Sequence, residues 1–206
     1  MTLEDALSEI PIVAIIRGVT PGEAPGIGEA LHRAGVRVVE VPLNSPEPLD
    51  SIRALAREFE GRLLVGAGTV LTPDKVDAVA EAGGRLIVSP NTNPAVIGRA
   101  VELGVPPFPG FATATEAFAA YDAGARHLKL FPASTYGTAH VKALLAVLPK
   151  DAFVYAVGGA GPANMAEWKV AGVTGFGLGS ELYRPGQSAD ETYEKALAAV
   201  RALRAL

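Results

Sequence analysis

The sequence predicts a closed (β/α)8 TIM barrel. Eight short runs rich in β-branched residues alternate with eight longer amphipathic stretches over the whole chain, and no linker separates one block from the next. The short runs are almost continuously apolar, as is typical of parallel strands that are buried on both faces. The chain has 206 residues, of which 49% are hydrophobic, so it is long enough for one domain but short for this fold. We therefore expect residues 1–206 to form a single small α/β barrel domain with short loops.

The predicted strands are runs of Val, Ile, Leu and Phe. In chain order they are residues 12–16, 36–41, 63–67, 85–89, 105–108, 126–131, 153–157 and 174–178. A count of eight favours a closed barrel over an open doubly wound sheet. The fifth run begins at Val105 and reads V-P-P-F-P, with three prolines that lack the N–H group a central ladder needs. We expect this strand to be irregular.

The predicted helices follow the strands, and several begin with proline and end at glycine, where these residues favour helix starts and stops. They comprise residues 21–34, 47–60, 73–82, 94–103, 113–123, 138–147, 162–171 and 189–204. The glycines that mark their ends are Gly35, Gly61, Gly83, Gly104, Gly124 and Gly172. Residues 2–9 precede the first strand, and we expect them to form an additional N-terminal helix that caps the floor of the barrel.

The composition excludes several classes of protein. With 18 basic and 22 acidic residues the net charge is -4, so the chain lacks the basic surface that nucleic-acid phosphates require. Cysteine is absent, which excludes disulfides, thiolate metal sites, iron–sulfur clusters and cysteine nucleophiles. Residues 1–10 carry acidic residues in place of a basic signal-peptide start, and no run of about 18 apolar residues occurs. We expect a cytoplasmic protein that binds neither nucleic acid nor membrane.

The sequence also lacks the motifs of common cofactor-dependent enzymes. No G-x-S-x-G elbow, P-loop or dinucleotide fingerprint occurs between a predicted strand and helix. His32 and His140 fall on predicted helices and only His127 lies on a strand, so no set of histidine ligands suits a divalent metal. We expect no metal and no cofactor, which disfavours metal-dependent aldol and epimerase chemistry.

One lysine lies within a predicted strand. The other five fall on helices or in a loop, whereas alternation along 126–131 turns Lys129 toward the barrel interior together with His127 and Phe131. Burial disfavours an ammonium ion, so the pKa of such a lysine falls toward the range in which the neutral amine is available as a nucleophile. A neutral amine is what Schiff-base chemistry requires. The alternative is a lysine whose head reaches solvent at the barrel mouth or pairs with a carboxylate.

Glu40 resembles Lys129 in its setting, because it is the one acidic residue in the middle of a valine-rich strand. An inward glutamate beside an inward lysine forms either a buried ion pair or an acid/base next to an imine-forming amine. The sequence does not separate these two interpretations. Arg17 ends the first strand, where a guanidinium can bind a carboxylate through two hydrogen bonds, although a plain surface arginine fits the same position.

Two glycine-dense turns follow the last two strands, at the place where many barrels bind phosphate. They read V-G-G-A-G-P over 157–162 and G-F-G-L-G-S over 175–180. Glycine lets backbone N–H groups approach phosphate oxygens, and the next helix N-terminus adds a favourable dipole. Tight turns that need positive φ are the structural alternative. The run G-A-G-T-V over 66–70 supplies Thr69 as a further polar contact.

Six motifs together resemble one family, the 2-keto-3-deoxy-6-phosphate sugar acid aldolases. They are V-E-V-P-L-N-S-P (39–46), G-A-G-T-V-L (66–71), S-P-N (89–91), P-G-F-A-T-A-T-E-A (109–117), K-L-F-P-A-S (129–134) and A-V-G-G (156–159). The run G-L-G-S-E-L-Y-R-P-G-Q-S (177–188) is similar to the galactonate branch of this family. The resemblance covers nearly the whole chain and implies a class I aldolase on a (β/α)8 barrel that assembles as a homotrimer.

The resemblance also assigns roles to residues. Lys129 would form the Schiff base and Glu40 would be the general acid/base. The keto-acid end of the substrate would be lined by Arg17, Thr69 and Pro90. The phosphate would be held by Gly158, Gly159, Gly179 and Ser180, and the remaining substrate-binding residues would be Phe131 and Val157. The gluconate branch has an arginine where Asn44 stands and a threonine where Val157 stands, so Arg17 becomes the expected ligand of the keto-acid carboxylate.

The implied reaction is retro-aldol cleavage of 2-dehydro-3-deoxy-6-phospho-D-galactonate to pyruvate and D-glyceraldehyde 3-phosphate, in D-galactonate catabolism. One alternative keeps the aldolase and changes the substrate to the C4-epimeric 2-dehydro-3-deoxy-6-phosphogluconate or to 4-hydroxy-2-oxoglutarate. A second is a sugar-phosphate epimerase that exchanges a proton next to a carbonyl without cleavage. A third is a sugar-phosphate-binding barrel without activity, because a fold does not fix a function.

Overall fold

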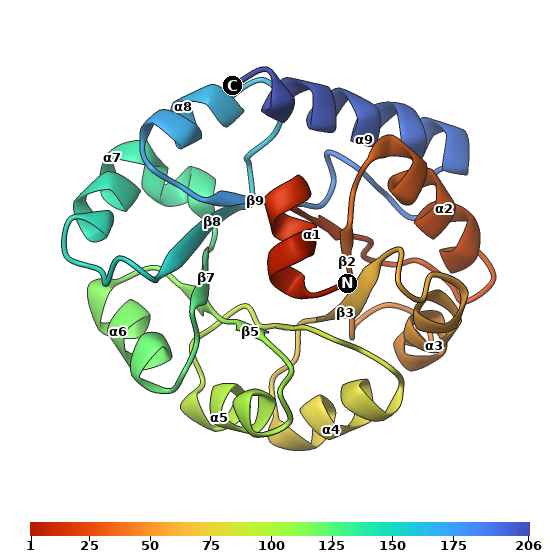
Figure 1. The fold of residues 1–206 in the computed structure, drawn as a ribbon, viewed down its shortest axis with the longest axis horizontal. Helices are drawn as coiled ribbons and strands as arrows, with labels where there is room; N and C mark the ends of the chain where they lie inside the picture. Colours follow the sequence, from red (N-terminus) through yellow and green to blue (C-terminus); the bar gives the residue numbers. More distant parts are fainter.

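A computed structural model describes all 206 residues, and it shows a ring of helices around a central cylinder of strands (Figure 1). Every strand pairing is parallel. Around the sheet the strands follow the order β5-β4-β3-β2-β1-β9-β8-β7-β6. The strands are β1 (Ile12–Ile15), β2 (Val38–Pro42), β3 (Leu64–Gly68), β4 (Ile87–Val88), β5 (Pro107–Phe108), β6 (Gly110–Phe111), β7 (His127–Leu130), β8 (Phe153–Val157) and β9 (Gly175–Leu178).

The two ends of this sheet order, β5 and β6, are separated in the chain only by Pro109. They are the two halves of the predicted fifth strand, which extends to Phe111 and not only to 108. The Ile87 N–H donates to the carbonyl of Pro106 at 3.0 Å, and the Lys129 N–H donates to the carbonyl of Pro109 at 2.9 Å. Prolines therefore accept hydrogen bonds on both sides although they cannot donate, and the eight-stranded barrel closes through this irregular strand.

The helices alternate with the strands as predicted. They are α1 (Leu3–Glu9), α2 (Ala24–Ala34), α3 (Pro48–Glu58), α4 (Pro73–Glu81), α5 (Pro94–Glu102), α6 (Ala114–Asp122), α7 (Ala133–Leu145), α8 (Met165–Val170) and α9 (Ala189–Arg204). None of them is both long enough and apolar enough to cross a lipid bilayer. The expected start of α7 at 138 was wrong: a first turn begins at Ala133, and Gly137, with φ of 78°, kinks the chain before the main helix.

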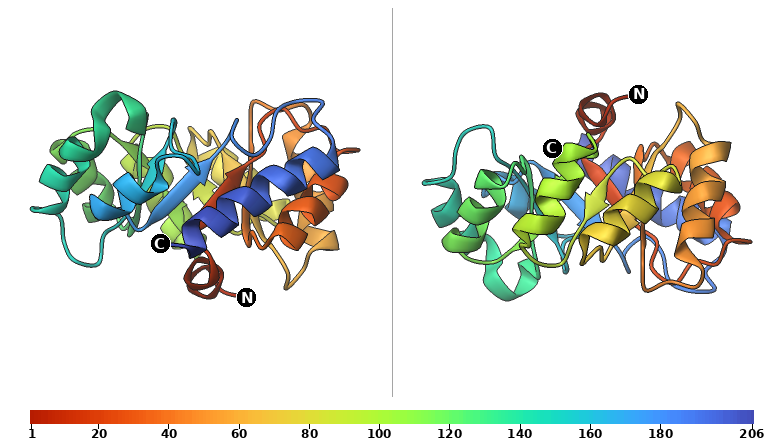
Figure 2. Two further views of the ribbon diagram at one scale, coloured as in Figure 1. Left: turned by 90° about the horizontal axis from the view of Figure 1, so that it is seen from above. Right: turned by 90° about the horizontal axis from the view of Figure 1, so that it is seen from below.

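The N-terminal helix closes one end of the barrel, as the sequence predicts. Figure 2 shows α1 standing out from that end, with the N-terminus beside it. Thr2 and Asp5 form a reciprocal capping box at the start of the helix. Leu3 and Leu7 are buried against side chains that point into the barrel, among them Val38 and Leu64. The other end of the barrel, where the strands finish, is left to the loops and carries the functional residues.

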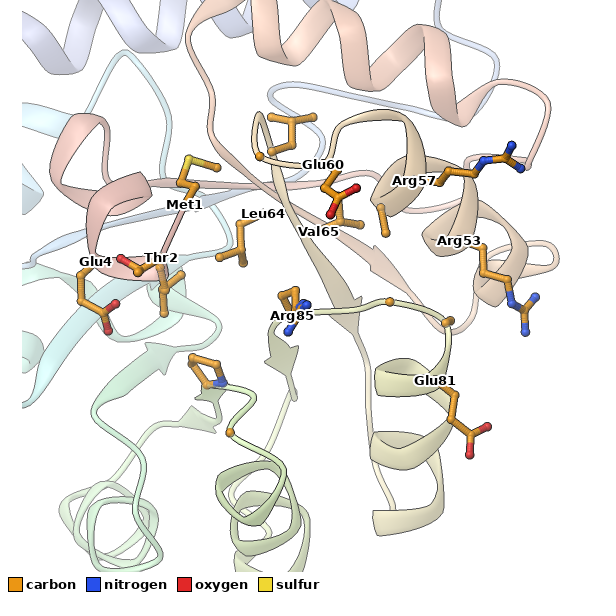
Figure 3. A pocket seen from close by; sticks show the side chains of 18 residues that line it. Met1, Thr2, Glu4, Arg53, Arg57, Glu60, Leu64, Val65, Glu81 and Arg85 are labelled. Carbon is orange, nitrogen blue, oxygen red and sulfur yellow. The ribbon is translucent and has the colours of Figure 1, made fainter.

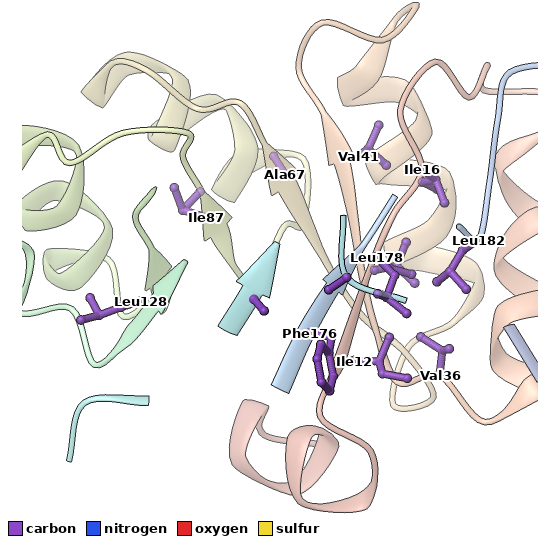
Figure 4. Close-up of a cluster of buried hydrophobic side chains, with 14 of the residues drawn as sticks. Ile12, Ile16, Val36, Val41, Ala67, Ile87, Leu128, Phe176, Leu178 and Leu182 are labelled. Carbon is purple, nitrogen blue, oxygen red and sulfur yellow. The ribbon is translucent and has the colours of Figure 1, made fainter. Parts of the chain in front are cut away.

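Buried side chains form two separate clusters because successive residues of a strand point to opposite faces. The larger cluster fills the space between the strands and the helix ring, and Figure 4 shows part of it, including Ile12, Val41, Leu128 and Phe176. The smaller cluster fills the barrel interior. Leu128 and Leu130 belong to the outer cluster, so the residue between them, Lys129, points inward as predicted.

Candidate active site

Lys129 and Glu40 meet inside the barrel. Lys129 on β7 is 7% exposed and Glu40 on β2 is 1% exposed. Both line a small cavity enclosed by apolar side chains, namely Val13, Ile15, Val88, Phe108, Tyr155 and Val157. The Lys129 ammonium lies 4.7 Å from the centre of the Phe131 ring, a cation–π distance. The lysine is therefore neither solvated at the barrel mouth nor part of the helix layer.

The surroundings shift the proton affinities of both groups. Burial lowers the pKa of Lys129, an effect that Glu40 opposes and Arg17 reinforces. Burial raises the pKa of Glu40 to about 7, against the attraction of Lys129 and Arg17. No ion pair or hydrogen bond joins the two side chains, and Oε2 of Glu40 has no hydrogen-bond partner at all. The two side chains thus share one cavity without forming a closed ion pair.

Gly68 makes room for the Glu40 carboxyl group. A Cβ atom on residue 68 would lie 2.0 Å from Oε2 of Glu40, far inside any permitted contact. The third strand thus ends in glycine at the point where the carboxyl group crosses it, within the run G-A-G-T-V. The motif serves the site by leaving space for Glu40.

Above this pair a larger cavity of about 330 Å³ opens at the strand ends. Arg17, Phe131, Val157, Gly158, Gly159, Gly179 and Ser180 line it together with Lys129. Glu40 lies just below, because Ile15, Lys129, Val157 and Gly177 border both cavities. The structure thus brings most of the sequence-predicted site residues around one opening at the carboxyl ends of β1, β7, β8 and β9, as expected for a barrel.

Two predicted residues do not line this cavity. Thr69 follows β3 with φ of 58°, an uncommon value for a residue with a side chain. Pro90 follows Ser89, whose hydroxyl donates to the carbonyl of Val70 at 2.7 Å. Both residues therefore come from the adjacent strands β3 and β4, whereas the cavity is lined from β1 and from β7 to β9. Their contact with substrate stays a prediction.

The turn after β8 has a fixed shape. Gly158 and Gly159 have consecutive positive φ values of 88° and 80°. Asn164 fixes this loop, because its Nδ2 donates to the carbonyl of Gly159 and its Oδ1 accepts from the N–H of Gly161, both at 2.9 Å. A Cβ atom on residue 159 would meet the Ser134 side chain at 2.5 Å. Successive backbone N–H groups in a turn form anion-binding concavities.

The turn after β9 begins at Gly179, whose carbonyl accepts from the N–H groups of Leu182 and Tyr183 at 2.8 and 2.9 Å. These two bonds close one tight turn directly after the strand. Sequence reasoning did not place Glu181, Tyr183 or Arg184 in the site, yet all three line the cavity. Their position directly after the predicted phosphate turn was the available signal.

Arg17 is oriented by its neighbours. Its Nη1 donates to Oδ1 of Asn44, and the N–H of Gly18 donates to the hydroxyl of Ser45 at 2.9 Å. These bonds join the loop after β1 to the loop after β2. Asn44 thus holds the guanidinium at the cavity that Lys129 also lines.

A second hollow, of about 960 Å³, lies at the opposite end of the barrel (Figure 3). Figure 3 shows it between α1, the α3 side of the ring and the start of β3, with Arg53 and Glu81 pointing away from its centre. None of the sequence-predicted site residues lines it. Arg126 is also remote from the functional cavity, since it stacks on Tyr121 and lies 3.3 Å from Asp151. No cluster of three or more His, Asp or Glu side chains with metal-binding geometry occurs in the structure.

Comparison with known proteins shows which family the chain belongs to. The profile of the aldolase family described as KDPG and KHG aldolase matches residues 3–198. The chain belongs to the KDPG and KHG aldolase family. Within it, the chain is 51% identical over 197 residues to the 2-dehydro-3-deoxy-6-phosphogalactonate aldolase of Escherichia coli strain K12, covering 96% of each protein.

Solved structures of aldolases share the fold over nearly the full length. A structure described as native KDPGal has a TM-score of 0.94 and 51% identity, with 96% of each chain covered. The KDPG aldolase of Legionella pneumophila, with pyruvate captured as a covalent carbinolamine intermediate, has a TM-score of 0.85 and 27% identity, with 95% of this chain and 96% of that one covered. The family resemblance and the barrel predicted from the sequence are both confirmed.

Proposed function

We propose that this aldolase cleaves 2-dehydro-3-deoxy-6-phospho-D-galactonate into pyruvate and D-glyceraldehyde 3-phosphate, in D-galactonate catabolism. The observation that carries the proposal is Lys129, a buried amine of lowered pKa, beside the unpartnered carboxyl group of Glu40 beneath an open cavity. The relative from Escherichia coli that is 51% identical bears the name of this activity. The cleavage proposed here, through a Schiff base on Lys129, requires neither a metal nor a cofactor.

Lys129 acts first, as the nucleophile. Its lowered pKa increases the fraction of neutral amine, which attacks the C2 ketone of the substrate to give a carbinolamine. Loss of water then yields an iminium ion that withdraws electrons from C3. The covalent carbinolamine of pyruvate described for the Legionella relative supports this order of events.

Glu40 moves the protons. Because burial raises the pKa of Glu40 to about 7, both its protonated and its ionised forms are populated near neutral pH. The acid form assists the departure of water from the carbinolamine, and the ionised form then takes the proton of the C4 hydroxyl as the C3–C4 bond breaks. The bonding electrons pass into an enamine, and D-glyceraldehyde 3-phosphate leaves. Protonation at C3 and hydrolysis of the imine release pyruvate and free Lys129.

Separate groups of residues bind the two ends of the substrate, on either side of the bond that breaks. Arg17, oriented by Asn44, takes the carboxylate. Thr69 and Pro90, which follow β3 and β4, complete the keto-acid end. Backbone groups of Gly158, Gly159 and Gly179 and the hydroxyl of Ser180 take the phosphate, while Phe131 lies over Lys129. Binding of the remote phosphate orients the reacting carbons, so a substrate without it loses kcat/KM.

Val157 supports the galactonate assignment. It ends β8 and lines both cavities, so it presents methyl groups to the reacting carbons where a threonine would present a hydroxyl. Identity is higher to the galactonate-named relative, at 51%, than to the KDPG aldolase from Legionella, at 27%. We further propose that the enzyme works in the cytoplasm as a homotrimer. A design described as fusing symmetric oligomeric domains contains a chain 52% identical to this one, which supports oligomerisation.

Release of pyruvate, coupled to lactate dehydrogenase, tests the function on the two C4-epimeric substrates side by side, with Lys129→Ala as the blank. We expect selective cleavage of the galacto epimer and no activity in the variant. Equal or reversed preference would refute the galactonate assignment and leave an aldolase. Deuterium uptake from solvent without pyruvate release would point to an epimerase, and tight binding without turnover to an inactive binding protein.

A further inference from the structure

Two charged residues that the proposed mechanism does not use lie beside the glycine turns. Glu181 and Arg184 belong to the segment that follows β9, and both line the 330 Å³ cavity. The tip of this segment is held in place, because Pro185 packs so closely on Gly18 that a Cβ there would lie 2.6 Å from Cγ of the proline. Neither charged side chain forms an ion pair, although Glu181 and Arg184 are only three positions apart.

Glu181 engages the hydroxyl group assigned to phosphate binding. The Ser180 hydroxyl donates to Oε2 of Glu181 at 2.7 Å, and a hydroxyl has only one proton to donate. The Glu181 side chain also leans over the other glycine turn, since a Cβ on Gly161 would lie 3.0 Å from its Cγ. A carboxylate therefore lies at the junction of the two turns.

Three cationic side chains line the cavity, and they come from different strands and turns. Arg17 follows β1 and Lys129 lies on β7, and both are committed to the keto-acid end. Arg184 is the third cation that lines the cavity and the one that belongs to the turn after β9. A sugar phosphate carries nearly two negative charges at neutral pH, and Arg binds phosphate through paired hydrogen bonds. Backbone N–H groups alone leave most of that charge unbalanced, and Glu181 adds to it.

We propose that Glu181 and Arg184 set the affinity of this site for a phosphate dianion in opposite directions. Arg184 binds the phosphate. Glu181 competes with the phosphate for the hydroxyl proton of Ser180. Glu181 holds the hydroxyl while the site is free and gives it up when phosphate arrives. This inference rests on the proposed function, because it takes the glycine turns as the phosphate end of that substrate.

Steady-state kinetics with the phosphorylated substrate and with its dephosphorylated counterpart tests the proposal in Arg184→Gln and Glu181→Gln. We expect Arg184→Gln to lower kcat/KM for the phosphorylated substrate about tenfold, the lower end for a hydrogen bond to a charged group. It should leave the slow cleavage of the dephosphorylated substrate unchanged. Arg57→Gln, an exposed arginine in the hollow at the far end of the barrel, is the matched control and should change neither.

Inorganic phosphate as a competitive inhibitor tests the second residue. We expect Glu181→Gln to lower its inhibition constant about threefold, as removal of a screened like charge at an exposed site predicts. The proposal would be overturned if Arg184→Gln lowered kcat/KM equally for both substrates, or if Glu181→Gln bound inorganic phosphate more weakly than the wild type. Calorimetric titration with inorganic phosphate repeats the comparison without turnover. If the wild type cleaves neither substrate but the variants shift phosphate binding as stated, the proposed function fails and the charge assignment stands.

Discussion

Replacing Glu40 with glutamine should have opposite effects on stability and on catalysis: it should raise the free energy of unfolding and lower kcat. Glu40 is 1% exposed, and one of its oxygens has no partner. Its pKa is raised from 4.5 to about 7 in the folded protein, and that value already includes the attraction of Lys129. Folded molecules therefore bind the proton more tightly than unfolded ones. The stability that this proton contributes is fully present below pH 4.5 and is lost as the pH rises through 7.

The magnitude follows from the shift in pKa. At about 1.4 kcal/mol per unit, the ionisation of Glu40 costs the folded state about 3 kcal/mol above pH 7. Glutamine has nearly the shape of the protonated acid and does not ionise. Glu40→Gln should thus match the wild type at pH 4 and exceed its free energy of unfolding by about 3 kcal/mol at pH 8. For a chain of this size that gain raises Tm by roughly 6–12 °C.

Thermal or urea unfolding at several pH values between 4 and 8 measures this difference, with Glu167→Gln, the same substitution at an exposed position on α8, as the control. The same Glu40→Gln protein should lose about 10²–10⁴-fold in kcat, the range for a general acid/base. A difference in stability that does not grow with pH, or that favours the wild type at pH 8, would refute the assignment of a costly buried carboxylate.

Two further predictions concern the residues that position the site. Gly68→Ala should displace the Glu40 carboxyl group, because the new Cβ would lie 2.0 Å from its oxygen. We expect this variant to have a lower kcat and a free energy of unfolding that is lower by about 1–3 kcal/mol. Gly98→Ala on α5, where a Cβ meets no atom within 4 Å, is the control and should be neutral or stabilising in the same thermal or urea unfolding assay. Asn44→Ala should free the Arg17 guanidinium and raise KM about three- to fivefold with little change in kcat, as expected for an exposed polar pair, and an equal fall in kcat would argue against a positioning role.

The barrel could be predicted from the sequence because its signals are local. Alternation along β7 assigned Leu128 and Leu130 to the helix layer and Lys129 to the interior, and both assignments hold. Prolines in the fifth strand correctly indicated irregularity. They did not reveal that the strand resumes at Gly110 after Pro109, because the ladder uses proline carbonyls as acceptors on both sides.

The site was less accessible to sequence reasoning where it depends on the packing of loops. Lys129 and Glu40 could be found because each is a charge in an apolar strand. Arg184 and Glu181 lie in an irregular segment, and their approach to the cavity depends on the packing of Pro185 against Gly18, which no periodic pattern encodes. The early start of α7 was missed because Gly137 separates its first turn from the amphipathic part.

The central claim is that Lys129 forms the Schiff base, and trapping that adduct tests it directly. The enzyme is incubated with pyruvate and sodium borohydride, digested, and analysed by peptide mass spectrometry to find which of the six lysines carries the reduced adduct. We predict modification of Lys129 with matching loss of activity, and no adduct in Lys129→Ala. An adduct on another lysine, or one that persists in Lys129→Ala, would contradict the assignment of the nucleophile.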